Sequence, residues 1–140
     1  MARYDKNAAA LEHIIAYCDR TDEARLRFGD SLTVFRADYD YRSCCSMYVY
    51  QIAEHCNHIS ADIKEKYANI PWKEIRGMRN IFAHDYDAVK INRLWHTMTS
   101  DFPVLREECL RILADLGYEY SPAENNELLA EDEENWDMEQ

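Results

Sequence analysis

The chain has 140 residues, which is the length of one domain with a modest hydrophobic core. It contains only 3 Gly and 3 Pro, and this scarcity of turn-forming residues favours an all-helical fold. No apolar run approaches the length of a membrane span, and the first residues lack the apolar core of a signal peptide. We therefore expect a cytoplasmic protein without a membrane segment.

The formal net charge of −11 argues against a nucleic-acid partner until its distribution is considered. Residues 124–140 carry eight acids and no Lys or Arg, which leaves −3 for the rest of the chain. The segment 64–93 contains seven basic residues and four acids, so its net charge is +3. A phosphate-binding surface is therefore allowed in that segment.

Five cysteines are present, an odd number without C-x-x-C spacing. They are Cys18, Cys44, Cys45, Cys56 and Cys109. This pattern indicates reduced thiols packed in the core of a cytosolic protein.

The first half of the chain has helical hydrophobic spacing. A first helix is expected from an Asp5 cap to about residue 20, and a second, capped by Thr21, over 22–28 and ended by Gly29. A long helix follows, beginning at either Ser31 or Asp38 and ending near residue 59.

The second half continues the pattern with a short helix, capped by Ser60 or Asp62 and ending at Tyr67, and a helix opened by Ile70-Pro71-Trp72. Two more helices are expected over 88–99 and 102–116, unless they form one long helix kinked at Pro103. We expect residues 1–120 to form one antiparallel helical bundle and residues 121–140 an acidic tail, disordered or loosely docked.

The most informative segment is Arg79-Asn80-Ile81-Phe82-Ala83-His84-Asp85-Tyr86. On a continuous helix Arg79 and His84 would lie about 140° apart, because each residue turns about 100°. The spacing therefore favours a helix end at a cleft, either loosened near Ala83 or shared with a second subunit.

The residue types suit RNA cleavage without a metal. The 2′-OH of RNA is the nucleophile, so the protein must move protons and stabilise the charged phosphoryl transition state. His84 is the candidate general base or acid, and Arg79 can hold the non-bridging oxygens. Asn80 could position the phosphate or the imidazole, and Glu54 could contact the same site.

A purely structural interpretation is the alternative. Arg79 would then pair with Asp85 or Asp87, His84 would cap a helix, and Tyr86 would pack. Each residue alone would favour that interpretation, but the three together at this spacing favour a function.

Glu54, His55, Cys56 and His58 raise the question of a metal site, but no fourth ligand stands at a known spacing. We expect them to be ordinary helix residues, and no metal or other cofactor is predicted. His13 and His96 fit no motif.

The R-x-x-x-x-H-x-Y pattern resembles the signature of the HepT-like toxins, a branch of the HEPN superfamily. The similarity extends over about residues 3–118 and includes Gln51-Ile52-Ala53-Glu54, Ile70-Pro71-Trp72-Lys73-Glu74-Ile75, Leu94-Trp95 and Asp101-Phe102-Pro103-Val104-Leu105. Ala53 departs from the family, which often has Gly there, and the acidic tail lies outside the family pattern.

The resemblance implies an all-α, HEPN-like homodimer with two copies of the motif lining a cleft across the interface. It implies a metal-independent endoribonuclease toxin of a type VII-like toxin–antitoxin pair. The partner would be an MntA-like nucleotidyltransferase antitoxin that transfers AMP to Tyr86 and so blocks the site. The alternative is a non-catalytic HEPN subunit that holds substrate or partner for a nucleotidyltransferase; a purely structural dimer would leave the motif unexplained.

Overall fold

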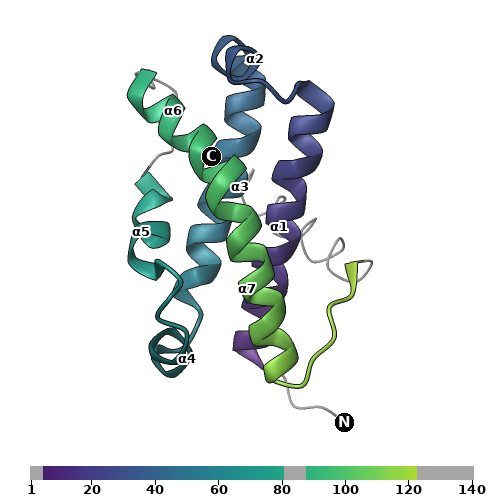
Figure 1. Ribbon diagram of the computed structural model, residues 1–140, viewed down its shortest axis with the longest axis vertical. Coiled ribbons are helices and arrows are strands. Elements are labelled where there is room, and N and C mark those ends of the chain that lie inside the picture. The colour runs from purple at the N-terminus through teal and green to yellow at the C-terminus, as the bar shows by residue number, and fades with distance from the viewer. Residues whose placement is uncertain (1–4, 81–87, 123–140) are drawn as a thin grey trace, which may run out of the picture.

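The protein is all-α over the residues that the computed structural model describes, 5–80 and 88–122 (Figure 1). The elements are α1 (Lys6–Phe28), α2 (Leu32–Ala37), α3 (Tyr39–Asn57), α4 (Ala61–Lys66), α5 (Trp72–Gly77), the 3-10 turn η1 (Met78–Asn80), α6 (Ala88–His96), the π-helical turn η2 (Thr97–Asp101) and α7 (Phe102–Asp115). This confirms the predicted fold class.

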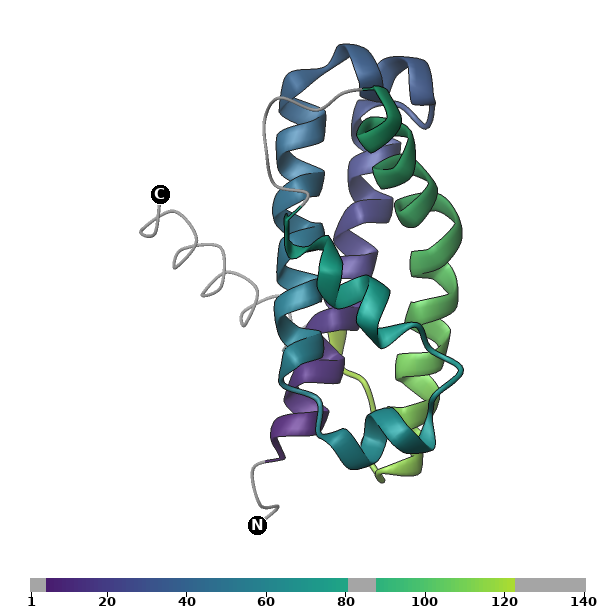
Figure 2. The ribbon, with the colours of Figure 1, turned by 90° about the vertical axis from the view of Figure 1, so that its left-hand side faces the viewer.

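Three long helices, α1, α3 and α7, lie side by side along the long axis of the molecule (Figures 1 and 2). α1 runs in one direction, and α3 and α7 run back in the other, so the bundle is antiparallel as predicted. α5 and η1 pack against α3, and α4 lies at the end of the bundle beyond the last residues of α3. The segment that leads into the motif therefore lies on the outer side of α3.

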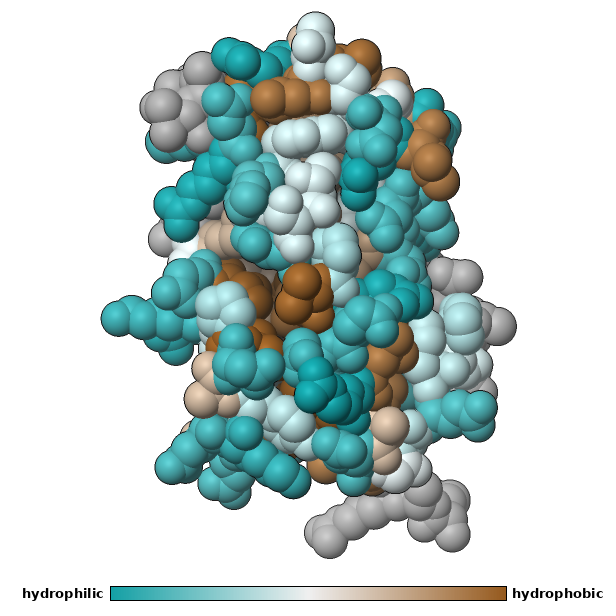
Figure 3. Space-filling view, viewed as in Figure 1, coloured by the Kyte–Doolittle hydropathy of each residue, from teal (hydrophilic) through white to brown (hydrophobic). Residues whose placement is uncertain are grey.

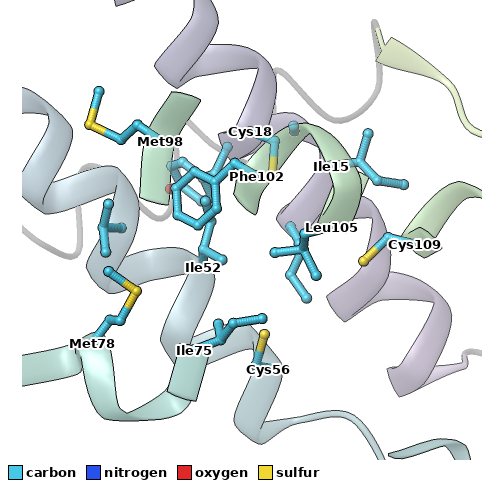
Figure 4. Close-up of a cluster of buried hydrophobic side chains, with 14 of the residues drawn as sticks. Ile15, Cys18, Ile52, Cys56, Ile75, Met78, Met98, Phe102, Leu105 and Cys109 are labelled. Carbon is cyan, nitrogen blue, oxygen red and sulfur yellow. The ribbon is translucent and has the colours of Figure 1, made fainter. Parts of the chain in front are cut away.

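The core is formed by apolar side chains from all three long helices and from α5. Figure 4 shows Ile15 of α1, Ile52 of α3, Ile75 of α5 and Leu105 of α7 converging on one another. Each of these side chains is buried. Burial of one such side chain stabilises the fold by about 1.5–3 kcal/mol, so this shared core fixes α5 against the bundle.

α1 begins at the predicted cap, since an Asp5 carboxylate oxygen accepts hydrogen bonds from the backbone N–H groups of Asn7 and Ala8 at 2.9 and 3.2 Å. It ends at Gly29, whose φ of 125° suits glycine. The predicted break at Thr21 is wrong. That side chain is buried and its hydroxyl donates to the carbonyl of Cys18 at 2.6 Å, which lets the helix continue.

Both predicted starting points of the next long helix are used. Ser31 precedes α2 and Asp38 precedes α3, where an Asp38 carboxylate oxygen accepts from the Tyr41 N–H at 3.1 Å. The two helices meet at Asp38 because its extended backbone ends one helix and caps the other.

The alternative of one long, kinked helix through Pro103 is the correct one. The backbone is helical on both sides of η2, and Asp101 makes no side-chain cap. Pro103 has no N–H to donate, and the wider π turn just before it accommodates that missing hydrogen bond.

The chain leaves α7 through Gly117, whose φ is 87°. The Tyr118 N–H then donates to the carbonyl of Leu113 at 3.0 Å. Tyr118 and Tyr120 pack against the core, so the chain remains docked to the bundle up to residue 120. Of the predicted acidic tail, residues 123–140 lie outside the described part of the chain.

Candidate functional site

The helix that leads into the motif is held by its apolar face. Trp72 and Ile75 of α5 and Met78 of η1 are buried at three-residue spacing against α3 and the core. The Trp72 indole N–H also donates to the backbone carbonyl of Tyr67 at 3.2 Å. These contacts place the following residue, Arg79, at the surface in a tight 3-10 turn.

The predicted neighbour Glu54 does lie beside Arg79. Arg79 Nε is 2.7 Å from Glu54 Oε1, and the two side chains are 45% and 28% exposed. The oxygen is nevertheless without an aligned hydrogen bond, so the contact is an ion pair with a poorly oriented N–H. α3 and η1 thus bring together two of the sequence-predicted site residues.

This geometry leaves the guanidinium able to bind a further anion. The contact with Glu54 uses Nε, and within the described part of the chain Arg79 has no second ion-pair partner. An arginine presents five N–H donors in a planar fork, which suits two oxygens of a phosphate. The contact through Nε leaves the two terminal amino groups of the guanidinium for that phosphate.

The remaining predicted site residues are not placed by the structure. His84 and Tyr86 lie in the segment 81–87, outside the described residues, as do Asp85 and Asp87 of the structural alternative. Asn80 ends η1, but its side chain is also outside the description.

The predicted change in helix geometry near Ala83 also lies outside the described residues. What the structure does show is that regular α-helix already ends at Gly77, with η1 following it. The five-residue spacing of Arg79 and His84 is thus not part of one continuous α-helix that begins at α5.

The buried thiols of Cys18, Cys56 and Cys109 are unsuited to act as nucleophiles or metal ligands. Burial raises the pKa of Cys56 to about 12 and places the pKa of Cys18 and Cys109 well above the ordinary value. They therefore stay protonated at neutral pH, and Figure 4 shows all three within the apolar core. All five cysteines are free thiols, as predicted.

A histidine pair was missed by the sequence reasoning. His13 Nδ1 of α1 lies 3.1 Å from His55 Nε2 of α3, and the two rings are 4.3 Å apart between centroids. They border a cavity of about 380 Å³ together with His58 and Lys6. No local motif could reveal a pair separated by 42 residues in the chain; only the α1–α3 register creates it.

No group of three or more His, Cys, Asp or Glu side chains among the described residues is arranged to hold a metal ion. In the same part of the chain, no helix is long and apolar enough to cross a membrane.

Comparison with known families gives one match over most of the chain. Residues 10–112 match the model of the family described as Ribonuclease HepT-like. This span includes α3, α5, η1 and the whole R-x-x-x-x-H-x-Y motif.

Curated relatives carry related names. "Putative RNase TTE0752" of Caldanaerobacter subterraneus subsp. tengcongensis is 31% identical over 103 residues, which cover 74% of this chain and 90% of that protein. "Probable ribonuclease HepT" of Thermococcus cleftensis is 36% identical over 55 residues, 39% of this chain and 50% of that protein. "Gamma-glutamylcyclotransferase and putative RNase MJ0434" of Methanocaldococcus jannaschii is 37% identical over 65 residues, 46% of this chain and 29% of that protein.

For the last two relatives, this chain spans half of their length or less. No solved structure gives a significant match to this chain.

Proposed function

The chain belongs to the HepT-like ribonuclease family, and from this premise we propose that it is an endoribonuclease that cleaves RNA without a metal. The observation that carries the proposal is the placement of Arg79 on a surface turn beside Glu54, five residues before the only histidine of the motif. An anchored cation followed closely by an imidazole provides the two groups that this reaction requires.

In the proposed reaction, His84 takes the proton from the ribose 2′-OH. The 2′ oxygen then attacks the adjacent phosphorus, and the bond from phosphorus to the 5′ oxygen breaks. The 5′ oxygen accepts a proton from an acid, for which a second copy of His84 across a dimer cleft is the proposed source. The products are a 2′,3′-cyclic phosphate and a 5′-hydroxyl, so all atoms and charges balance.

Arg79 stabilises the charge that develops on the non-bridging oxygens during this step. Before RNA binds, Glu54 holds the guanidinium through Nε at 2.7 Å and keeps it from folding away into solvent. The terminal amino groups of Arg79 then face the incoming phosphate without first having to be ordered.

We expect substitution of either group to abolish RNA cleavage. Arg79→Ala and His84→Ala should each lower the rate by about two to three orders of magnitude, because each removes one transition-state interaction. Both proteins should keep the helical circular dichroism of the wild type. Cleavage that persists at the wild-type rate in both variants would remove the proposed assignment.

The proposed biological role is that of a toxin in the cytoplasm, paired with an MntA-like nucleotidyltransferase antitoxin. The antitoxin would join the Tyr86 phenol oxygen to the α-phosphate of ATP, with loss of the phenol proton and release of pyrophosphate. Each added AMP brings one negative charge close to the motif. At about 4 Å and an effective dielectric near 20, its attraction to Arg79 is about 4 kcal/mol before desolvation.

Tyr86→Phe tests this regulation. The variant should gain no AMP in the presence of the cognate nucleotidyltransferase and ATP, whereas the wild-type protein should gain mass in whole AMP units. Intact-mass spectrometry followed by peptide mapping measures both. Equal modification of the Tyr86→Phe protein would place the acceptor elsewhere in the chain.

The proposed active unit is a two-fold dimer of the helical domain, residues 1–120, with the acidic tail outside it. One copy of the motif provides one imidazole, whereas the reaction uses a base and an acid. Light scattering at micromolar protein concentration should give twice the mass of one chain, and a monomeric mass combined with full activity would contradict the shared cleft.

A further inference from the structure

A small cavity next to the motif segment is surrounded by positive charge. It has a volume of about 180 Å³ and is lined by Lys64 of α4 and by Trp72, Lys73 and Arg76 of α5. No carboxylate side chain of the described residues lines it. Its lining thus consists of three cations around one indole.

Local structure explains why these side chains meet. Lys73 and Arg76 are three residues apart on α5, so they lie on one side of that helix. Lys64 comes from the neighbouring helix α4, which Figure 2 shows directly below α5 at the end of the bundle. In the space-filling view, hydrophilic side chains project along this edge, while apolar surface is visible between α5 and α7 (Figure 3).

The indole forms a wall of the cavity. Trp72 is only 9% exposed, and its N–H is already donated to the Tyr67 carbonyl. It therefore offers neither an open ring face for a base to stack on nor a free donor. What the cavity presents to a ligand is the ammonium and guanidinium groups.

The three cavity cations differ in their ion pairing from Arg25 and Arg106. Arg25 pairs with Asp22 and Asp30, and Arg106 pairs with Asp19. Within the described part of the chain, Lys64, Lys73 and Arg76 form no ion pair and no side-chain hydrogen bond.

The all-cationic lining is informative because the chain has 27 acids for 16 lysines and arginines. Acids are close by in sequence: Glu65 follows Lys64, and Glu74 of α5 lines a different cavity with Arg93. The cavity thus gathers three cations and no acid in a chain that is acidic overall, and the ligand that complements it is an anion.

The cavity is also continuous with the proposed site along the chain. Lys73, Arg76 and Arg79 follow one another at three-residue spacing, and each comes directly after one of the buried residues Trp72, Ile75 and Met78. Lys64, Lys73, Arg76 and Arg79 therefore form a cationic track that runs from α4 to the motif.

We propose that this cavity is a phosphate subsite for the backbone of the RNA substrate, beside the phosphate that is cleaved. This inference rests on the proposed ribonuclease function. Three cations bind the phosphates and so hold the sugar–phosphate backbone in position. Because the cavity offers no surface for base stacking, it does not discriminate between RNA sequences. The subsite contributes binding and alignment, whereas Arg79 and His84 carry the chemistry.

The test separates binding from cleavage by using His84→Ala protein and a fluorescent single-stranded RNA. The cavity variant carries Lys64→Gln, Lys73→Gln and Arg76→Gln. The matched control carries Lys6→Gln, Arg27→Gln and Arg36→Gln, three exposed cations on α1 and α2. Both triples change the net charge by the same amount, so any general electrostatic effect is equal.

The cavity variant should bind RNA at least about tenfold more weakly than the control at low salt. The slope of log affinity against log salt should fall by about 0.7 for each phosphate that the protein no longer neutralises. Equal weakening of RNA binding in the two triples would overturn the subsite. So would displacement of the RNA by AMP at the same phosphate concentration, since that would assign the cavity to a free nucleotide.

Cleavage by proteins with an intact His84 is the separate readout for the proposed function. If the cavity variant alone binds RNA more weakly and the wild type cleaves nothing, the subsite is supported and the ribonuclease proposal fails. If the wild type cleaves RNA and both triples bind it equally, the ribonuclease proposal stands and the subsite is wrong.

Discussion

At the scale of single residues, the proposed chemistry depends on how Arg79 is held. Its side chain is half exposed and has one close anionic partner within the described part of the chain, Glu54, from a helix more than twenty residues earlier. The apolar row of α3 predicts this neighbour, because Glu54 follows that row along the helix. The 2.7 Å distance shows that the two side chains meet, and the catalytic role of either residue stays a prediction.

Glu54→Gln separates orientation of Arg79 from stability. Since the pair is partly exposed, the free energy of unfolding in urea should change by less than about 1 kcal/mol. RNA cleavage should fall by roughly tenfold, because the guanidinium loses the charge that aligns it. Glu23→Gln, an exposed position on α1, is the control and should change neither quantity. Unchanged cleavage by Glu54→Gln would show that Arg79 is oriented by something else.

At the scale of elements, most helices could be predicted from the sequence because their signals are local. The Asp5 cap, the two glycine termini and the apolar spacing each act within a turn or two of helix. Thr21 misled the prediction because a threonine that caps one helix can equally well bond backward within another. The choice between a break and a kink at Pro103 depended on packing, which the local sequence does not specify.

Two glycines at helix ends are expected to respond differently to alanine. Gly29 has a φ of 125°, and an added Cβ would lie 3.3 Å from a Val34 methyl group. Gly29→Ala should therefore destabilise the fold by roughly 1–3 kcal/mol. At Gly77 an added Cβ meets nothing within 4 Å, so Gly77→Ala should be neutral or stabilise by up to about 1 kcal/mol. Urea unfolding curves measure both, and equal effects would contradict the backbone argument.

At the scale of the whole molecule, two features built from distant segments escaped prediction. The His13–His55 pair and the cavity around Trp72 both arise from the way helices pack against one another. Neither corresponds to a sequence motif with a fixed spacing. The motif itself was recognisable because its residues lie close together in the chain. The contact of Arg79 with Glu54 was the one contact between distant segments that the sequence did predict, from the apolar row of α3.

The buried thiols make the stability of the bundle sensitive to alkaline pH. The pKa of Cys56 rises by burial from an ordinary 9.0 to about 12, and the pKa values of Cys18, Cys45 and Cys109 are also raised by burial. A raised pKa of an acid means that the folded state resists deprotonation. The stability that a buried, protonated thiol contributes is complete below pH 9.0, and it is lost as the pH rises toward the pKa of the folded state.

The free energy of unfolding, measured in urea with a reductant present, should therefore be constant from pH 7 to about 8.5 and then fall steeply. Each buried thiol contributes a loss of about 1.4 kcal/mol per pH unit in that range. A free energy of unfolding that stays constant up to about pH 11 would show that the thiols are accessible in the folded state.

The most direct test of the central claim is cleavage of a defined single-stranded RNA by the wild-type protein in EDTA, with mass spectrometry of the product ends. We predict cleavage without any added metal, a 2′,3′-cyclic phosphate on one product and a 5′-hydroxyl on the other, and loss of both products in His84→Ala. Cleavage that stops in EDTA and returns with a divalent metal, or that yields a 5′-phosphate, would contradict the proposed mechanism.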